Sequence, residues 1–252
     1  MRRVYKFPQK DYACRGDARG LISNGFGGYY CFDDSLSYQG WYLFYGDQWR
    51  MQKVLESIVP VQEGEVTRVF NQFYGYRREF ASGAQDTVIP YQRSLLYCTT
   101  QLHGEVKFVF DGRESYEGSR LGRDYRVEFD GDYAFVYFSQ QGSNDMVEFE
   151  QVIAWKGVQD ARIIGNWYEK NYSFDEHRKS RHRYWVYEGF ACKPRQHMVI
   201  SVGKTKSEAR TLADIAYFHF DDIVATMHER ANDRVVLSGH ITDLTLQAAD
   251  SC

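Results

Sequence analysis

The sequence predicts a mainly β protein, a large antiparallel β-sandwich (a supersandwich) followed by a C-terminal linker helix. Its 252 residues include 20 tyrosines and 17 phenylalanines, which favour pleated, half-buried surfaces. From about residue 54 to 202, short alternating runs are separated by turn residues, with no helical pattern between them. After Gly203 the apolar spacing becomes helical. We therefore expect a sandwich domain over 1–203 and a helical region over 204–252.

The strands of the predicted sandwich are read from alternation and from turn signals. An alternating run over 106–110 ends at Asp111-Gly112. Runs over 125–129 and 133–138 flank Asp130-Gly131, a strong hairpin signal. Apolar side chains alternate with Glu148 and Glu150 over 147–155, as in a half-buried strand. Further short strands are predicted at 162–167, 184–192 and 197–202.

A single long helix is predicted at 206–232. Thr205 and Glu208 have the spacing of a capping box at a helix start. One apolar stripe follows, with three- or four-residue spacing, at Leu212, Ala216, Phe220, Ile223, Met227 and Ala231. A shorter helical pattern at 243–250 has apolar residues that need cover, and we expect more protein to pack on it.

Charge and cysteine usage narrow the class of protein. The net charge of −3 and the isoelectric point of about 6.2 argue against nucleic-acid binding through a basic face. The five cysteines are scattered without C-x-x-C spacing, so neither a metal site nor a disulfide framework is expected. The sequence offers no signal peptide and no membrane-spanning run. We expect a soluble, cytoplasmic protein without a cofactor.

The most informative stretch is a glycine cluster, Leu21-Ile-Ser-Asn-Gly-Phe-Gly-Gly-Tyr29. Its glycines allow a tight turn or a close backbone approach, and a structural turn between two strands is the simpler interpretation. Asn24, Gly25, Gly27, Gly28 and Tyr29 resemble the N-G-x-G-G-Y signature of glycogen debranching enzymes of the bacterial and archaeal amylo-α-1,6-glucosidase type.

The resemblance extends from about residue 19 to 250, mostly as order and spacing. Residues 37–43 stand where that family has a segment similar to Arg-Tyr-His-Gly-Leu-Leu, but here arginine is replaced by Ser37 and histidine by Gln39. Residues 166–172, 184–190 and Lys193-Pro194 also resemble the family, and 246–250 is similar to the segment that opens its catalytic α/α barrel. The resemblance thus implies that 204–252 is a helical linker with the start of an α/α-barrel domain. The resemblance implies an N-terminal, non-catalytic sandwich that packs on an α/α barrel and helps shape its α-glucan cleft. It places the catalytic carboxylates in the barrel.

Aromatic residues near the matching segments are candidates for sugar contacts, because a flat ring packs on the apolar face of a pyranose. We select Tyr38, Gln39, Trp41 and Trp167 as candidate substrate-binding residues. Tyr29, Tyr30, Tyr42 and Tyr168 belong to a wider set, and the alternative for most of these rings is the core of the sandwich.

No catalytic constellation is found. Glycosidic cleavage usually needs two carboxylates across the bond. The adjacent pairs Asp33-Asp34 and Asp221-Asp222 are expected to diverge into solvent, and Glu114 is expected on a surface loop. His177 and His182 lie in a basic run that is most simply a solvated loop. No metalloprotease or serine-nucleophile motif is present.

Two other functions remain open from the sequence. The chain fits a free-standing carbohydrate-binding or interaction protein that pairs with a separately encoded barrel. It also fits a mutarotase-like enzyme on a similar sandwich, which would require a histidine and a carboxylate converging in one cleft.

Overall fold

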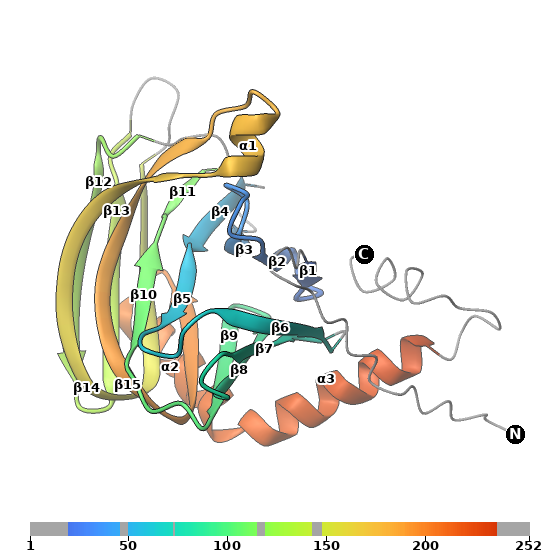
Figure 1. Cartoon of the computed structure of the whole chain (residues 1–252). Helices are drawn as coiled ribbons and strands as arrows, with labels where there is room; N and C mark the ends of the chain where they lie inside the picture. Colours follow the sequence, from blue (N-terminus) through green and yellow to red (C-terminus); the bar gives the residue numbers. More distant parts are fainter. Residues whose placement is uncertain (1–19, 46–49, 73, 115–118, 143–147, 236–252) are drawn as a thin grey trace, which may run out of the picture.

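The computed structural model describes residues 20–45, 50–72, 74–114, 119–142 and 148–235. It confirms the predicted fold class: two antiparallel sheets form a sandwich, and helices follow at the C-terminal end. Figure 1 shows long curved strands on one side of the molecule, with the smaller N-terminal sheet across their concave side.

The smaller sheet has five strands in the order β1-β2-β3-β4-β11. Their bounds are β1 Gly20–Ser23, β2 Gly28–Phe32, β3 Gly40–Tyr45, β4 Arg50–Leu55 and β11 Arg113–Glu114. The chain thus leaves this sheet after β4 and returns to its edge with β11.

The larger sheet has ten strands, eight of them in the order β12-β13-β14-β15-β9-β8-β7-β6, while β10 pairs with both β15 and β5. Their bounds are β5 Ser57–Pro60, β6 Val66–Asn71, β7 Tyr76–Phe80, β8 Gln85–Tyr91, β9 Ser94–Thr100, β10 Val106–Phe110, β12 Arg123–Asp130, β13 Tyr133–Gln140, β14 Phe149–Asn171 and β15 Arg183–Gly203. The hairpin predicted at Asp130-Gly131 is present as β12–β13.

The predicted series of short strands after residue 147 is wrong in one respect, because β14 and β15 are two long continuous strands. They pair along almost their whole length with three register shifts, of which two fall between the predicted strands 147–155 and 162–167 and the third falls within the second of them. The first lies at Gly157, whose φ is +92°. A side chain there would meet the carbonyl of His197 at 2.6 Å, so glycine allows the bulge. The turn-like residues therefore bend the strands without ending them.

The main core lies between the sheets and is built from aromatic rings. Phe110, Trp155 and Phe190 are fully buried and pack edge-to-face or stacked on one another. Phe108 stacks on Phe190 with ring centroids 4.9 Å apart. The high aromatic content of the sequence is thus used largely to fill the sandwich.

The predicted helix at 206–232 is interrupted. The structure has α2 at Lys206–Phe218 and α3 at Phe220–Val235, separated at His219, and a short α1 at Ser173–His177 precedes them. The Oγ1 atom of Thr205 accepts a hydrogen bond from the Glu208 amide as predicted, whereas the Glu208 carboxylate bonds the Lys204 amide. The rings on both sides of the break, Tyr217 and Phe220, pack against His197 of β15.

Helix α2 packs on the outer face of the larger sheet, opposite the main core. Ala209 and Ala213 are fully buried against Phe135 and Ala154, and their small side chains allow a close approach of helix and sheet. The segment 243–250, for which a helix is predicted, lies outside the described residues. Among the described helices none has both the length and the apolar character needed to cross a bilayer.

His197 makes the packing of the two helices sensitive to pH. Burial lowers the pKa of His197, although Asp221 opposes the shift. The unfolded state, with a pKa of about 6.5, therefore binds the proton more readily, and stability should fall as the pH drops through this value. We expect the urea midpoint to decrease between about pH 7.5 and about pH 5.5, and His197→Phe to reduce the decrease. The control His177→Gln, at an exposed position, should show the same decrease of the urea midpoint as the wild type. A decrease in His197→Phe as large as that of the wild type would contradict this account.

Candidate functional site

The glycine cluster forms a closed turn around the Asn24 side chain. Its Oδ1 atom accepts hydrogen bonds from the amides of Phe26 and Gly28, each at 2.8 Å. Its Nδ2 atom donates to the carbonyl of Gln92 in the β8–β9 turn at 2.6 Å. Asn24 thus closes the β1–β2 connection and ties it to the larger sheet.

The glycines of the cluster have separate roles. Gly25 and Gly27 have φ values of +72° and +82°, which other residues rarely adopt. Gly28 has no room for a side chain, since a Cβ would lie 2.7 Å from the carbonyl of Tyr42. Tyr29 follows on β2 and stacks on Tyr42 with ring centroids 4.7 Å apart. This geometry is that of a structural turn.

Beside this turn, six charged residues form a network that we call the buried charge cluster. They come from both sheets and from the connections between them: Lys53, Glu56, Asp111, Arg113, Arg123 and Lys170. All except Lys170 have side chains with no exposed surface. The cluster therefore joins the two sheets through ion pairs that water does not reach.

Asp111 is the most heavily paired member of the cluster. Its Oδ2 atom lies 2.7 Å from Arg113 Nε and 3.0 Å from Lys53 Nζ, and its Oδ1 atom lies 2.9 Å from Arg123 Nη1. Burial disfavours the charged carboxylate, yet Arg113, Lys53 and Arg123 together hold the pKa of Asp111 well below its usual range. Asp111 therefore stays ionised inside the protein.

Glu56 is the second anion of the cluster. It pairs with Lys53 and accepts a hydrogen bond from Gln39 Nε2, and its Oε1 atom lies 2.9 Å from Lys170 Nζ. Burial opposes its ionisation, but Lys53 and Lys170 lower the pKa of Glu56. Neither carboxylate of the cluster has the raised pKa of a general acid.

The cluster has four cations for two carboxylates, and other groups compensate the excess. The carbonyl oxygen of Ser37 accepts from Arg113 Nη2 at 2.7 Å, from Lys53 Nζ at 3.1 Å and from the Tyr42 hydroxyl at 3.2 Å. The guanidinium of Arg113 lies 4.3 Å from the ring centroid of Tyr184, a cation–π contact. Dipoles and ring faces thus supplement the carboxylates.

The candidate substrate-binding residues fall into two groups. Gln39 is buried and donates a hydrogen bond to Glu56. Trp41 is buried in the main core, the alternative that the sequence left open for the aromatic candidates. Tyr38 and Trp167 are half-buried. Tyr38 stacks on Tyr42, and Trp167 packs on Tyr125, Tyr187 and the guanidinium of Arg123. Only Tyr38 and Trp167 keep a surface that a ligand can reach.

All buried carboxylates among the described residues have a structural partner. Besides Glu56 and Asp111, Asp33 accepts hydrogen bonds from Ser35, and Glu63 accepts them from the Ser82 hydroxyl and from the amides of His103 and Gly104. Asp86 is bound by Arg78 and the Tyr97 hydroxyl. Asp175 accepts from the Ser37 amide and pairs with Arg178. No carboxylate of this group is left for chemistry on a ligand.

The remaining acids and histidines considered in the sequence lie at the surface. Asp34, Asp221 and Asp222 are exposed, whereas Asp33 is buried and not solvated as expected. The side chain of Glu114 lies outside the description. Two histidine–carboxylate pairs occur in the described part of the chain, His182 with Glu176 at 4.0 Å and His219 with Asp222 at 3.6 Å, and neither lines a pocket.

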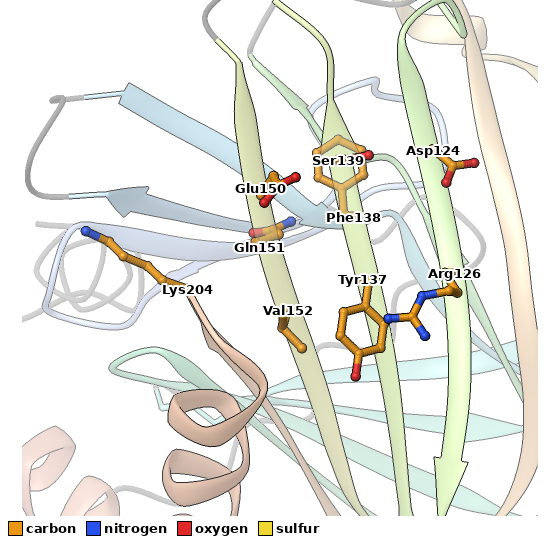
Figure 2. Close-up of a pocket in the computed structure, with 9 residues that line it drawn as sticks. All are labelled: Asp124, Arg126, Tyr137, Phe138, Ser139, Glu150, Gln151, Val152 and Lys204. Atoms are coloured by element: carbon orange, nitrogen blue, oxygen red, sulfur yellow. The ribbon is translucent and has the colours of Figure 1, made fainter.

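A hollow of about 280 Å³ lies elsewhere, on the outer face of β12, β13 and β14 (Figure 2). Its floor includes Phe138, Gln151 and Val152, and polar side chains surround it: Asp124, Arg126, Tyr137, Ser139, Glu150 and Lys204. Asp124 and Glu150 are both exposed and project from one sheet face. Nothing there desolvates one carboxylate to make it an acid, so the pair lacks the opposed environments of a glycosidase.

The sequence did not predict the buried charge cluster. Asp111-Gly112 was interpreted as a turn, although Asp111 is fully buried. The available signal was the presence of Lys53 and Glu56 inside an otherwise apolar run, Val54-Leu55 and Ile58-Val59. Buried charges need partners, so such an interruption indicates a counter-ion elsewhere in the fold.

Comparisons with known proteins establish no family for this chain. No family model matches this chain, and neither does a curated protein sequence. Among solved structures, a bacterial glucoamylase complexed with acarbose is similar, with a TM-score of 0.37 and 11% identity. The match covers 98% of this chain and 39% of the glucoamylase chain, so this chain spans about two fifths of that protein. A similarity this low does not establish a family or an activity.

Removal of one cation from the buried charge cluster should be strongly destabilising. We expect Lys53→Met to lower the free energy of unfolding by about 3–5 kcal/mol, because Glu56 and Asp111 would be left without their shared partner. Urea unfolding followed by tryptophan fluorescence measures the change. Lys193→Met, which removes an exposed pair with Asp160, is the control and should have little effect. Equal effects of the two substitutions would contradict the role of the cluster.

The closed turn gives a second prediction. Asn24→Ala removes two acceptor contacts and the donor to Gln92, and we expect a loss of about 2–3 kcal/mol in unfolding free energy. Ser23→Ala, which removes one exposed hydrogen bond to the Gly25 amide, should cost much less. The structural interpretation fails if Asn24→Ala is as stable as the wild type in thermal unfolding.

Proposed function

We propose that this chain is a non-catalytic β-sandwich domain of a glycogen-debranching-type α-1,6-glucosidase, which packs on an α/α barrel and helps shape its α-glucan cleft. The non-catalytic part of this proposal rests on the pairing and the pKa values of the buried carboxylates. Each buried carboxylate of the described residues is held by a structural partner, and these partners lower the pKa values of Glu56, Glu63 and Asp111. A glycosidase acid needs the opposite shift.

The carbohydrate part of the proposal rests on the sequence. The Asn24–Tyr29 signature resembles the debranching family, and the sandwich followed by helices agrees with the order of elements that this resemblance implies. Tyr38 and Trp167 are the candidate residues with accessible rings that we carry forward as contacts to an α-glucan. The division at 203/204 and the barrel partner belong to the same proposal.

A second candidate function is a free-standing carbohydrate-binding protein that pairs with a separately encoded barrel. The hollow on the outer face favours it, because a binding module needs an accessible polar site of its own. A mutarotase-like activity has less support, since neither histidine–carboxylate pair of the described residues lies in a cleft.

The proposed function is tested by assaying the chain on α-1,6-linked isomaltooligosaccharides. We expect no release of reducing sugar above the blank, because the described residues hold no acid–base pair suited to glycosidic cleavage. Panose hydrolysis by a known debranching enzyme is the positive control. Hydrolysis that survives purification to homogeneity would overturn the proposal.

The packing role is tested separately by reading the coding sequence past Cys252. A continuing α/α barrel supports the domain assignment. A stop codon with a barrel gene elsewhere supports the free-standing module, and the lack of a barrel in either place contradicts both.

A further inference from the structure

The outer face of β12–β14 is only partly covered by helix α2. Ala209 and Ala213 of α2 cover the cross-strand row of Phe135 and Ala154. The next row, Tyr137 with Val152, is partly covered, since Val152 is buried in the same cluster as Ala209 and Ala213. The row of Ser139 with Glu150 lies beyond it, toward the end where Lys204 precedes the helix. The hollow of about 280 Å³ occupies this uncovered area.

A row of three polar side chains crosses the hollow. The register places Asp124 of β12 opposite Ser139 of β13, and Ser139 opposite Glu150 of β14. Figure 2 shows the two carboxylates on the outer strands with Ser139 between them. Because adjacent strands lie about 4.8 Å apart, the backbones that carry the carboxylates are about 10 Å apart. That interval leaves room for a ligand above Ser139.

These three side chains make no hydrogen bond or ion pair with the described part of the protein. Neither carboxylate has an ion pair or hydrogen bond within the described residues, and the Ser139 hydroxyl has no such partner there either. The nearby Glu128 differs, since it pairs with Arg126 at 3.5 Å and with Lys206. Asp124, Ser139 and Glu150 are thus available to an external ligand.

The charges around the hollow select the class of ligand. Among the described residues of the lining, the two acids Asp124 and Glu150 are matched by two bases, Arg126 and Lys204, so their formal charges balance. Glu128 and Lys206 beside it also balance each other. A balanced lining does not favour an anion or a cation, whereas carboxylate acceptors with hydroxyl and cationic donors suit a neutral ligand that has many hydroxyl groups.

We propose that this hollow is a binding site for a neutral saccharide of one or two rings. Asp124 and Glu150 accept hydrogen bonds from sugar hydroxyls, and Ser139 and Lys204 complete the contacts. Tyr137 forms the wall next to Arg126, whose guanidinium lies 3.8 Å from its ring centroid. The volume is just below the range of about 300–1,000 Å³ typical of small-molecule pockets, which limits the ligand to this size.

This site differs from the cleft in the proposed function. It lies on the face of the sheet opposite the main core, and none of Tyr38, Gln39, Trp41 and Trp167 lines it. Sugar binding in the hollow requires no barrel. It would give either a packing domain or a free-standing module its own point of attachment to a glucan.

The test is a titration of the whole chain with maltotriose, followed by amide chemical shifts and calorimetry. We expect saturable binding in the millimolar range, with shifts centred on 124–126, 137–139 and 150–152. The double variant Asp124→Ala/Glu150→Ala should weaken binding at least about tenfold, because both charge-assisted acceptors are removed. Glu65→Ala/Glu169→Ala carries the same change in charge at exposed positions and should bind as the wild type does.

Three outcomes would overturn this site. They are no saturable binding of maltotriose, binding that the Asp124/Glu150 double variant retains, and saturation by inorganic phosphate or 1,5-diaminopentane in place of the sugar. These failures are separate from those of the proposed function. A chain that hydrolyses no glycosidic bond can still fail to bind maltotriose here, and loss of binding in the double variant says nothing about a barrel.

Discussion

The ionised carboxylate of Asp111, buried among three cations, is the interaction on which the rest of the structure depends. It links Lys53 of β4 and Arg113 of β11, in the smaller sheet, to Arg123 of β12 in the larger one. Moving charges out of water costs several kcal/mol per ion, and only a complete set of partners offsets that cost. The two sheets therefore have one relative position at which the cluster is satisfied, and this requirement selects the arrangement that the apolar core then fills.

The buried charge cluster also limits which side chains on the inner side of the sandwich can contact a ligand. Ser37 and Gln39, the two positions at which the sequence departs from the segment it resembles, are both engaged with the cluster. A side chain that completes a buried charge network cannot at the same time turn to a ligand without leaving that network unsatisfied. The replacements in the sequence and the burial in the structure thus point the same way: this segment stabilises the sandwich.

The sequence predicted the parts of the fold that depend on local patterns. Alternation gave the β10 strand and the β12–β13 hairpin, and the capping residues gave the start of α2 at Lys206. It failed where a distant contact overrides the local pattern. Strands β14 and β15 run through turn-like residues because each supports the other, and the helix stops at His219 where rings on both sides pack on His197. Charge pairs between residues 53, 111 and 123 leave no periodic trace in a sequence, so Lys53 and Glu56 in an apolar run indicate that counter-ions exist but do not identify them.

The candidate binding residues likewise depend on distant contacts that the sequence pattern does not show. Sequence reasoning looked for sugar contacts among aromatic residues near a motif, and the sandwich uses much of that aromatic surface as core, Trp41 included. Asp124, Ser139 and Glu150 belong to three strands, and only the register of β12, β13 and β14 brings them into one row. Because the inner face is filled by rings and ion pairs, the polar side chains of the larger sheet that face solvent lie on its outer face. Helix α2 begins one row too late to cover Ser139 and Glu150, and among the described residues neither these two nor Asp124 has a hydrogen-bond or ion-pair partner.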